Sequence, residues 1–217
     1  MWTVPNMLTF LRLLLVPVFL WFATRGTTGG AVTAGITFLV AGLTDTLDGW
    51  IARRYGSDSD LGRFLDPLAD KLLVLSALYW AALGTGAARS WFSIWFVHLI
   101  ALREIAITGL RTVRRLRGRQ VITASEGKLK TTLQIITIAL VLVFEAAARV
   151  MDSVGWSGRW IDSAPVWWLV QAFFAAAVIM TVISGVRYFT VNAATMPVSA
   201  SGPADDDAGE TAPRGRT

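Results

Sequence analysis

Six aspartates occur in a stretch that connects two long apolar segments of the chain. Residues 45–70 read DTLDGWIARRYGSDSDLGRFLDPLAD. Four of these aspartates form two pairs, Asp45 with Asp48 and Asp66 with Asp70. The first pair falls at the end of one predicted helix, and the second pair falls at the start of the next. Because charge beside apolar spans is costly and usually functional, this stretch is the first candidate for chemistry.

Helical spacing predicts that each pair shares one helix face. A helix turns by about 100° per residue, so Asp48 lies about 60° from Asp45 around the axis. The same two faces carry small residues and one cation: Gly49, Ala52 and Arg53 on the first helix, and Gly62 on the second. If these faces meet, four carboxylates converge and repel one another unless cations are bound. Mg²⁺ or Mn²⁺ is the natural occupant, and two ions about 3.5–4 Å apart suit in-line phosphoryl transfer.

Aspartates near helix ends also act as caps or as solvated loop charges. We interpret Asp58 and Asp60, in the connecting loop, in that way. Four acids at spacings of three and four residues, on faces that also hold small residues, favour the metal site over this alternative.

The complete pattern resembles the signature of the CDP-alcohol phosphotransferases. Every position of that signature is filled, with its gap of eight residues kept: Asp45-x-x-Asp48-Gly49-x-x-Ala52-Arg53, then Gly62-x-x-x-Asp66-x-x-x-Asp70. The resemblance implies an all-α integral membrane enzyme with six transmembrane helices, usually a homodimer, in the bacterial plasma (inner) membrane. It also implies that a phosphatidyl or phosphoalcohol group is transferred from a CDP-linked donor with release of CMP.

The resemblance also implies roles for single residues. Asp70 would be the catalytic base that takes the proton, while also lying near a metal ion. Gly49 and Ala52 would leave space for the cytidine, and Arg53 would hold the donor diphosphate. Two overlapping sets follow: Asp45, Asp48, Asp66 and Asp70 for the two metal ions, and Asn6, Thr9, Asp48, Gly49, Ala52, Arg53 and Gly62 for the CDP donor.

Three further stretches resemble the members of this family that use glycerol 3-phosphate as acceptor. They are Pro5-Asn6-x-Leu8-Thr9-x-x-Arg12, the run from Arg103 to Arg111, and Gly127-Lys128-x-Lys130-Thr131-x-x-Gln134. The implied reaction transfers the phosphatidyl group of CDP-diacylglycerol to glycerol 3-phosphate. Basic side chains bind phosphate oxygens well, so Arg111, Lys128 and Arg187 are the candidates for the acceptor's phosphate.

Two alternatives stay open from the sequence. Inositol 1-phosphate, serine or phosphatidylglycerol could be the acceptor in the same chemistry. A divalent-cation transporter could use the same acids, although carboxylates for transport are expected near the bilayer midplane and these lie at one end of their helices.

Composition places these residues in a polytopic membrane protein. The 217 residues are 54% hydrophobic and the mean hydropathy is +0.54, which is far above a soluble domain. The absence of cysteine excludes disulfides and thiolate metal sites. The net charge of +5 resides in basic loops between apolar helices, so we expect lipid and anion contacts and no nucleic acid.

Six helices must position the site, and we expect them over residues 1–24, 31–54, 62–83, 91–113, 126–150 and 166–192. A cleaved signal peptide is the alternative for the first, but no basic region precedes it and Arg12 interrupts it, so we expect a retained helix with Asn6 as its cap. Residues 1–195 form the predicted membrane domain. Residues 196–217, rich in Pro, Gly, Ala and Asp, form a predicted disordered tail.

Basic residues predict the orientation of these helices. If the amino terminus is inside, the inner loops hold the basic clusters of residues 53–63 and 111–130, and the outer loops hold few cations. This bias places both termini and the aspartates on the cytoplasmic side. Two features near the site each have two interpretations. Lys71 could snorkel or pair with an acid, and Arg103 with Glu104 could join helices or line a polar cavity.

Overall fold

The computed structural model describes residues 4–55, 60–84, 90–116 and 127–193. Within these ranges, the backbone alone is described for residues 4–6, 45–55, 60–64, 66–67, 115–116, 127–128, 158–159 and 191–193. The described part is all-helical, with these elements: α1 (Val4–Ala23), α2 (Thr28–Tyr55), α3 (Asp60–Leu83), α4 (Ile94–Leu116), α5 (Gly127–Ser153), the short 3-10 helix η1 (Gly158–Asp162) and α6 (Ala164–Ala193).

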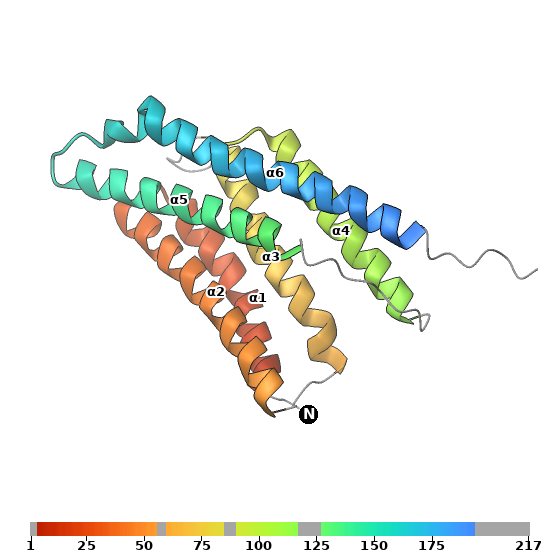
Figure 1. The fold of residues 1–217 in the computed structure, drawn as a ribbon. Helices are drawn as coiled ribbons and strands as arrows, with labels where there is room; N and C mark the ends of the chain where they lie inside the picture. The colour runs from red at the N-terminus through yellow and green to blue at the C-terminus, as the bar shows by residue number, and fades with distance from the viewer. Residues whose placement is uncertain (1–3, 56–59, 85–89, 117–126, 194–217) are drawn as a thin grey trace, which may run out of the picture.

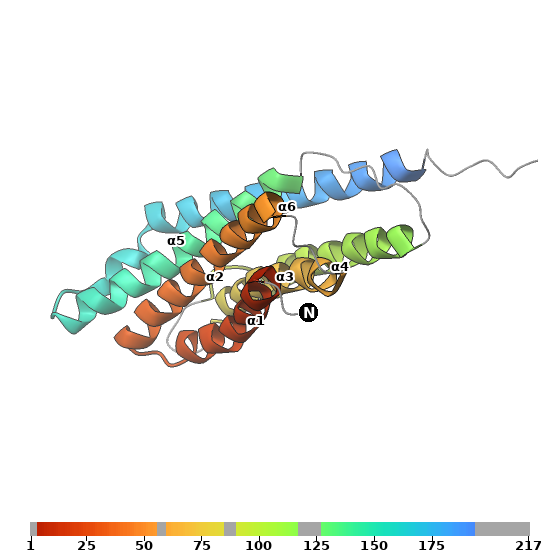
Figure 2. The same cartoon turned by 90° about the horizontal axis from the view of Figure 1, so that it is seen from below.

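The six α-helices close into a ring whose order differs from the chain order. α1 packs on α2 and α3, α5 packs on α2 and α6, and α4 packs on α3 and α6. α3 and α5 also contact each other across the middle of this ring. Seen from below, α5 and α6 lie along one side, α1, α3 and α4 along the other, and α2 runs obliquely between them (Figure 2).

The end of α2 and the start of α3 lie at one end of the bundle, at the lower edge of Figure 1. These are the segments that carry the two aspartate pairs. The opposite end is fixed by direct polar contacts. The indole nitrogen of buried Trp91 donates to Glu145 at 2.9 Å, and Arg149 donates both to Glu145 at 3.2 Å and to the carbonyl of Gly26 at 2.9 Å. These contacts join α5 to the α1–α2 turn and to the segment before α4, at the end of the bundle opposite the candidate chemistry.

The predicted helices are confirmed, with local differences of a few residues, such as the start of α2 at Thr28 and not at residue 31. α1 begins at Val4, so Asn6 lies in its first turn and is not the cap. α4 begins at Ile94 and not at residue 91, because Trp91 is held by tertiary contacts: its amide donates to the carbonyl of Ala81 at 2.9 Å and its indole to Glu145. The predicted loop over residues 151–165 contains η1. The predicted tail, residues 196–217, lies outside the described residues.

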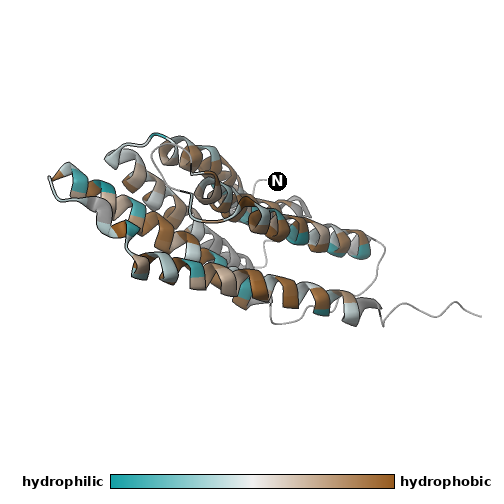
Figure 3. Cartoon of the chain, turned by 90° about the horizontal axis from the view of Figure 1, so that it is seen from above, coloured by the Kyte–Doolittle hydropathy of each residue, from teal (hydrophilic) through white to brown (hydrophobic). Residues whose placement is uncertain are grey.

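The outer faces of the helices are strongly apolar. Large hydrophobic side chains point outward on several helices, including Leu14, Leu43, Trp95, Leu102 and Trp168. Figure 3 shows that hydrophobic residues occur along the length of the helices. Such extended apolar surface is typical of contact with lipid or with a partner protein. Within the described ranges, the segments Leu129–Ser153 and Ala164–Thr190 are long and apolar enough to cross a membrane, and Met7–Ala23 and Thr28–Thr44 are shorter apolar helices.

A tight turn between α1 and α2 gives the first testable prediction. A Cβ at Gly30 would lie 2.8 Å from the carbonyl oxygen of Phe22 and 2.9 Å from Oγ1 of Thr27, whereas a Cβ at Gly29 would meet nothing within 4 Å. We therefore expect Gly30→Ala to lower the free energy of unfolding by about 1–3 kcal/mol. Gly29→Ala is the matched control, and we expect it to leave stability equal or slightly higher. Thermal unfolding of both variants in the same detergent checks this, and equal melting temperatures would contradict it.

Candidate active site

The two aspartate pairs lie on helices, as the sequence predicted. Asp45 and Asp48 belong to the last turns of α2, and Asp66 and Asp70 belong to the first turns of α3. Helical backbone at these positions places the members of each pair on one face. Of the four, Asp70 is the one whose side chain is described. Further predicted site residues have side chains outside the described part of the chain: Asn6, Asp45, Asp48, Gly49, Ala52, Arg53, Gly62, Asp66 and Lys128.

Asp70 lines a cavity formed by three helices. The cavity is small and partly open to the exterior. Its lining is as follows: Asp70, Lys71, Val74 and Leu75 from α3, Glu104 from α4, and Thr131 and Gln134 from α5. The side chain of Asp70 is half-buried. A carboxylate in this position can contact a bound substrate, as a general base must.

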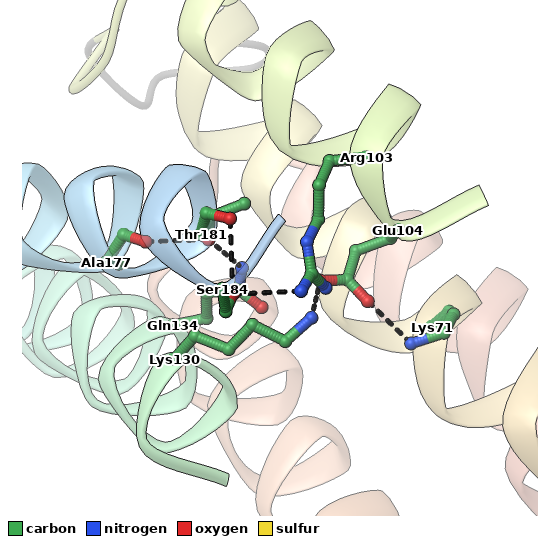
Figure 4. A network of polar contacts seen from close by, with 8 residues as sticks. All are labelled: Lys71, Arg103, Glu104, Lys130, Gln134, Ala177, Thr181 and Ser184. Atoms are coloured by element: carbon green, nitrogen blue, oxygen red, sulfur yellow. Dashed lines mark hydrogen bonds and ion pairs between the residues drawn. The ribbon is translucent and has the colours of Figure 1, made fainter. Parts of the chain in front are cut away.

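Glu104 is the centre of an ionic cluster beside this cavity. It is 5% exposed. Its Oε2 accepts from Lys71 Nζ at 2.6 Å, and its Oε1 accepts from Arg103 Nη1 at 2.9 Å and from Lys130 Nζ. Figure 4 shows these side chains converging from α3, α4 and α5. One buried carboxylate therefore neutralises part of the charge of three cations, and it does so at the wall of the Asp70 cavity.

The contacts of this cluster distinguish between the alternative interpretations of Lys71 and of Arg103 with Glu104 that the sequence left open. Lys71 pairs with an acid, Glu104, and it also lines the cavity. Glu104 joins α4 to α3 and α5, and it also lines the cavity. Both interpretations of this residue, as a link between helices and as part of a polar cavity, are therefore correct. Arg103 joins α4 to α6, because its Nη2 donates to Ser184 Oγ at 2.8 Å.

Two polar residues of α6, which the sequence patterns did not predict as part of the site, contact members or neighbours of the cluster. Ser184 accepts from Arg103 and donates to the carbonyl of Thr181 at 3.2 Å. Gln134 of α5 donates to Thr181 Oγ1 at 3.4 Å (Figure 4). The signal was present as two polar residues three positions apart within the apolar run of residues 172–186, a spacing that places both on one helix face.

The predicted acceptor-binding residues lie in different settings. Arg111 stacks on Tyr188 of α6, with its guanidinium carbon 5.4 Å from the ring centroid. This contact extends the α4–α6 seam that begins with Arg103 and Ser184. Arg187, the neighbour of Tyr188 in the sequence, is exposed. Thr9, predicted to face the donor, is completely buried on α1.

The four predicted aspartate ligands are chemically suited to bind a hard divalent cation. Within the described part of the chain, no group of three or more His, Cys, Asp or Glu side chains could hold a metal ion. The predicted ligands Asp45, Asp48 and Asp66 lie outside that part. Four carboxylates on two consecutive helices are the oxygen ligands that Mg²⁺ and Mn²⁺ prefer. The metal site therefore stays a prediction that the helical placement of the aspartates supports.

Comparison with known proteins assigns the chain to a class. The model of the CDP-alcohol phosphatidyltransferase family matches residues 2–162. The chain therefore belongs to the CDP-alcohol phosphatidyltransferase family, whose members depend on divalent metal ions. This result confirms the resemblance that the aspartate signature indicated.

Several relatives within this family are similar to the chain over most of its length. The chain is 33% identical over 204 residues to the CDP-diacylglycerol–glycerol-3-phosphate 3-phosphatidyltransferase of Bacillus subtilis (strain 168), covering 88% of this chain and 96% of the relative. It is 37% identical over 187 residues to a probable phosphatidylglycerophosphate synthase of Mycobacterium tuberculosis (strain H37Rv), covering 84% and 78%. It is 31% identical over 190 residues to the CDP-diacylglycerol–glycerol-3-phosphate 3-phosphatidyltransferase of Escherichia coli (strain K12), covering 86% and 93%.

Proposed function

We propose that this chain transfers the phosphatidyl group of CDP-diacylglycerol to glycerol 3-phosphate and releases CMP, in the biosynthesis of phospholipids. The observation that carries the proposal is the similarity, over most of both chains, to relatives whose names state this reaction. The filled aspartate signature and the cavity at Asp70 support it.

The reaction forms one bond and breaks another at a single phosphorus. A hydroxyl of glycerol 3-phosphate attacks the phosphorus that carries the diacylglycerol, and the bond from this phosphorus to the oxygen of CMP breaks. Asp70 takes the hydroxyl proton, because its carboxylate faces the cavity in which the acceptor would lie. Arg53 binds the donor diphosphate, while Gly49, Ala52 and Gly62, with Asn6 and Thr9, shape the donor site.

Two Mg²⁺ or Mn²⁺ ions, held by Asp45, Asp48, Asp66 and Asp70, would neutralise the negative charge of the donor diphosphate. We expect chelation of divalent ions to abolish CMP release, and addition of Mg²⁺ or Mn²⁺ to restore it. The measurement is CMP release from CDP-diacylglycerol by purified protein, with and without glycerol 3-phosphate. Full turnover in excess chelator would contradict the metal assignment.

An acceptor panel in the same assay tests the substrate. Glycerol 3-phosphate should support CMP release, and inositol 1-phosphate, serine and phosphatidylglycerol should not. Faster release with one of these three would retain the family chemistry and overturn the proposed acceptor. Metal-ion flux into proteoliposomes that contain no CDP-lipid would instead favour a transporter.

Arg111 offers a test of acceptor binding, together with Lys128 and Arg187. Hydrogen bonds from a cation to a phosphate contribute about 1.5–3 kcal/mol, so Arg111→Ala should raise the KM for glycerol 3-phosphate by about tenfold to a hundredfold. The KM for CDP-diacylglycerol should change by less than about twofold, since the donor's phosphates are bound elsewhere. Tyr188→Phe is the matched control, because it keeps the aromatic ring under the guanidinium. An equal rise in both KM values would contradict the assignment.

We also propose how this enzyme lies in the membrane. Residues 1–195 form one catalytic domain whose six helices span the plasma membrane of a bacterium, with both termini and the aspartates on the cytoplasmic side, and residues 196–217 form a cytoplasmic tail. The distribution of Lys and Arg and the apolar outer faces of the helices support this arrangement. Two chains form a homodimer, as the family resemblance implies. The acyl chains of the donor would stay in the bilayer while its headgroup enters the site.

A further inference from the structure

Lys71 is a charged residue of the cavity that the proposed mechanism does not use. It follows Asp70 directly in α3, and both side chains line the cavity. The Lys71 side chain is 27% exposed, whereas that of its partner Glu104 is 7% exposed. The ammonium group lies 2.6 Å from Glu104 Oε2. A long, flexible side chain is therefore held at its charged end by a buried group on a different helix.

The group that holds Lys71 is itself fixed from several directions. Glu104 also accepts from Arg103 and Lys130, and Arg103 donates to Ser184 of α6. Lys71 is thus attached to a point that α4, α5 and α6 share (Figure 4). The ion pair links α3 to α4 at the lining of the cavity.

This attachment constrains the direction of Asp70. Consecutive residues of a helix are separated by about 100° around the axis and about 1.5 Å along it. When the side chain of Lys71 is held on one side, rotation or sliding of this turn of α3 is restricted. The neighbouring carboxylate is then restricted as well. Misplacement of a reacting group by about 1 Å can reduce a rate by about a hundredfold.

We propose that Lys71 is a positioning residue, whose ion pair with Glu104 holds the α3 turn that carries Asp70 in the orientation needed for proton transfer. The proposal rests on the proposed function of Asp70 as the base. It differs from a role in substrate binding, because the ammonium group of Lys71 is already committed to Glu104. A positioning residue affects kcat, whereas a residue that binds substrate uniformly affects KM.

The kinetic test compares two replacements of Lys71. Lys71→Met removes the charge and keeps an unbranched side chain, and we expect it to lower kcat by about tenfold to a hundredfold, with both KM values changed by less than about twofold. Lys71→Arg keeps a cation that can reach Glu104, and it should recover kcat to within about threefold. Arg25→Met is the control for loss of one positive charge, because Arg25 stacks on Trp21 in the turn that follows α1, and its kcat should equal that of the parent.

A double variant tests whether Lys71 acts through Glu104. If it does, Lys71→Met combined with Glu104→Gln should have a kcat within about threefold of the slower single variant, because each change breaks the same pair. Multiplied losses, a rise in KM at unchanged kcat, or an unchanged kcat in Lys71→Met would each overturn the proposal.

A second measurement does not need activity. The chain has no cysteine, so spin labels can be attached to Leu68→Cys on α3 and Leu129→Cys on α5, which are 44% and 51% exposed. Double electron–electron resonance should give one narrow distance distribution in the parent, and a broadened or shifted one when Lys71→Met is added. An unchanged distribution would overturn the proposal. Absence of CMP release from the parent with every acceptor would overturn the proposed function instead, so the two failures are distinguishable.

Discussion

Asp70→Asn is expected to lower the rate of CMP release by about a hundredfold to ten-thousandfold, the contribution that a general base makes. Asparagine has nearly the same shape as aspartate but cannot accept the proton of the attacking hydroxyl. Because Asp70 lines an open cavity and is half-buried, the replacement should leave the fold intact. The measurement is the initial rate at saturating CDP-diacylglycerol and glycerol 3-phosphate, for the parent and for Asp70→Asn. The melting temperatures of the two proteins are compared in parallel.

Asp152→Asn is the matched control for this variant. Asp152 lies at the carboxyl end of α5, far from the cavity, and is exposed. The same chemical change there should leave the rate unchanged. Asp70 is also a predicted metal ligand, so the rate of Asp70→Asn should be measured over a wide range of Mg²⁺ concentrations. Turnover restored by high Mg²⁺ would assign Asp70 to metal binding alone, and normal turnover at ordinary Mg²⁺ would refute the base assignment.

Glu104→Gln is expected to have the largest effect on stability. The variant removes the carboxylate that three cations share, and leaves Lys71, Arg103 and Lys130 close together with less compensation. Removal of one partner of a buried ion pair commonly costs about 3–5 kcal/mol, because the remaining charge stays buried. Unfolding of the purified protein in detergent micelles, followed by circular dichroism, should show this loss.

Glu145→Gln is the control for the loss of a buried carboxylate. Glu145 is buried to a similar degree, 6% exposed against 5% for Glu104. Its partners are Arg149, which also donates to the carbonyl of Gly26, and the indole of Trp91, which a glutamine oxygen can still accept from. We therefore expect a smaller loss than in Glu104→Gln. Adding Lys130→Met to Glu104→Gln should recover part of the stability by removing one uncompensated cation. A larger loss in Glu145→Gln would contradict the importance of the Glu104 cluster.

The sequence predicted the helices and the aspartate site from local patterns. Apolar runs of sufficient length gave six helices close to their observed bounds, and the signature placed both aspartate pairs on helices. Local patterns gave wrong helix bounds where tertiary contacts determine the start of a helix. Trp91 is excluded from α4 because its backbone and side chain are held by α3 and α5, and Asn6 lies inside α1 although its residue type favours a cap.

The partners of Glu104 could not be predicted for a related reason. They come from three different helices, and periodicity within one helix does not tell which other helices adjoin it. The ring order α1, α2, α5, α6, α4, α3 is a property of the packing of the whole bundle. Once this order is known, the meeting of Lys71, Glu104 and Lys130 follows from the contacts of α3 with both α4 and α5.

The same ring order has a consequence for biosynthesis. A ribosome delivers the helices in chain order, yet α4 must be joined by α6, which is made after α5. Until α6 emerges, Arg103 lacks Ser184, and Arg111 lacks the ring of Tyr188. The contacts of α4 with α6 are therefore completed only after α6 has been made, and nascent chains that lack α6 carry the aspartates without a finished site.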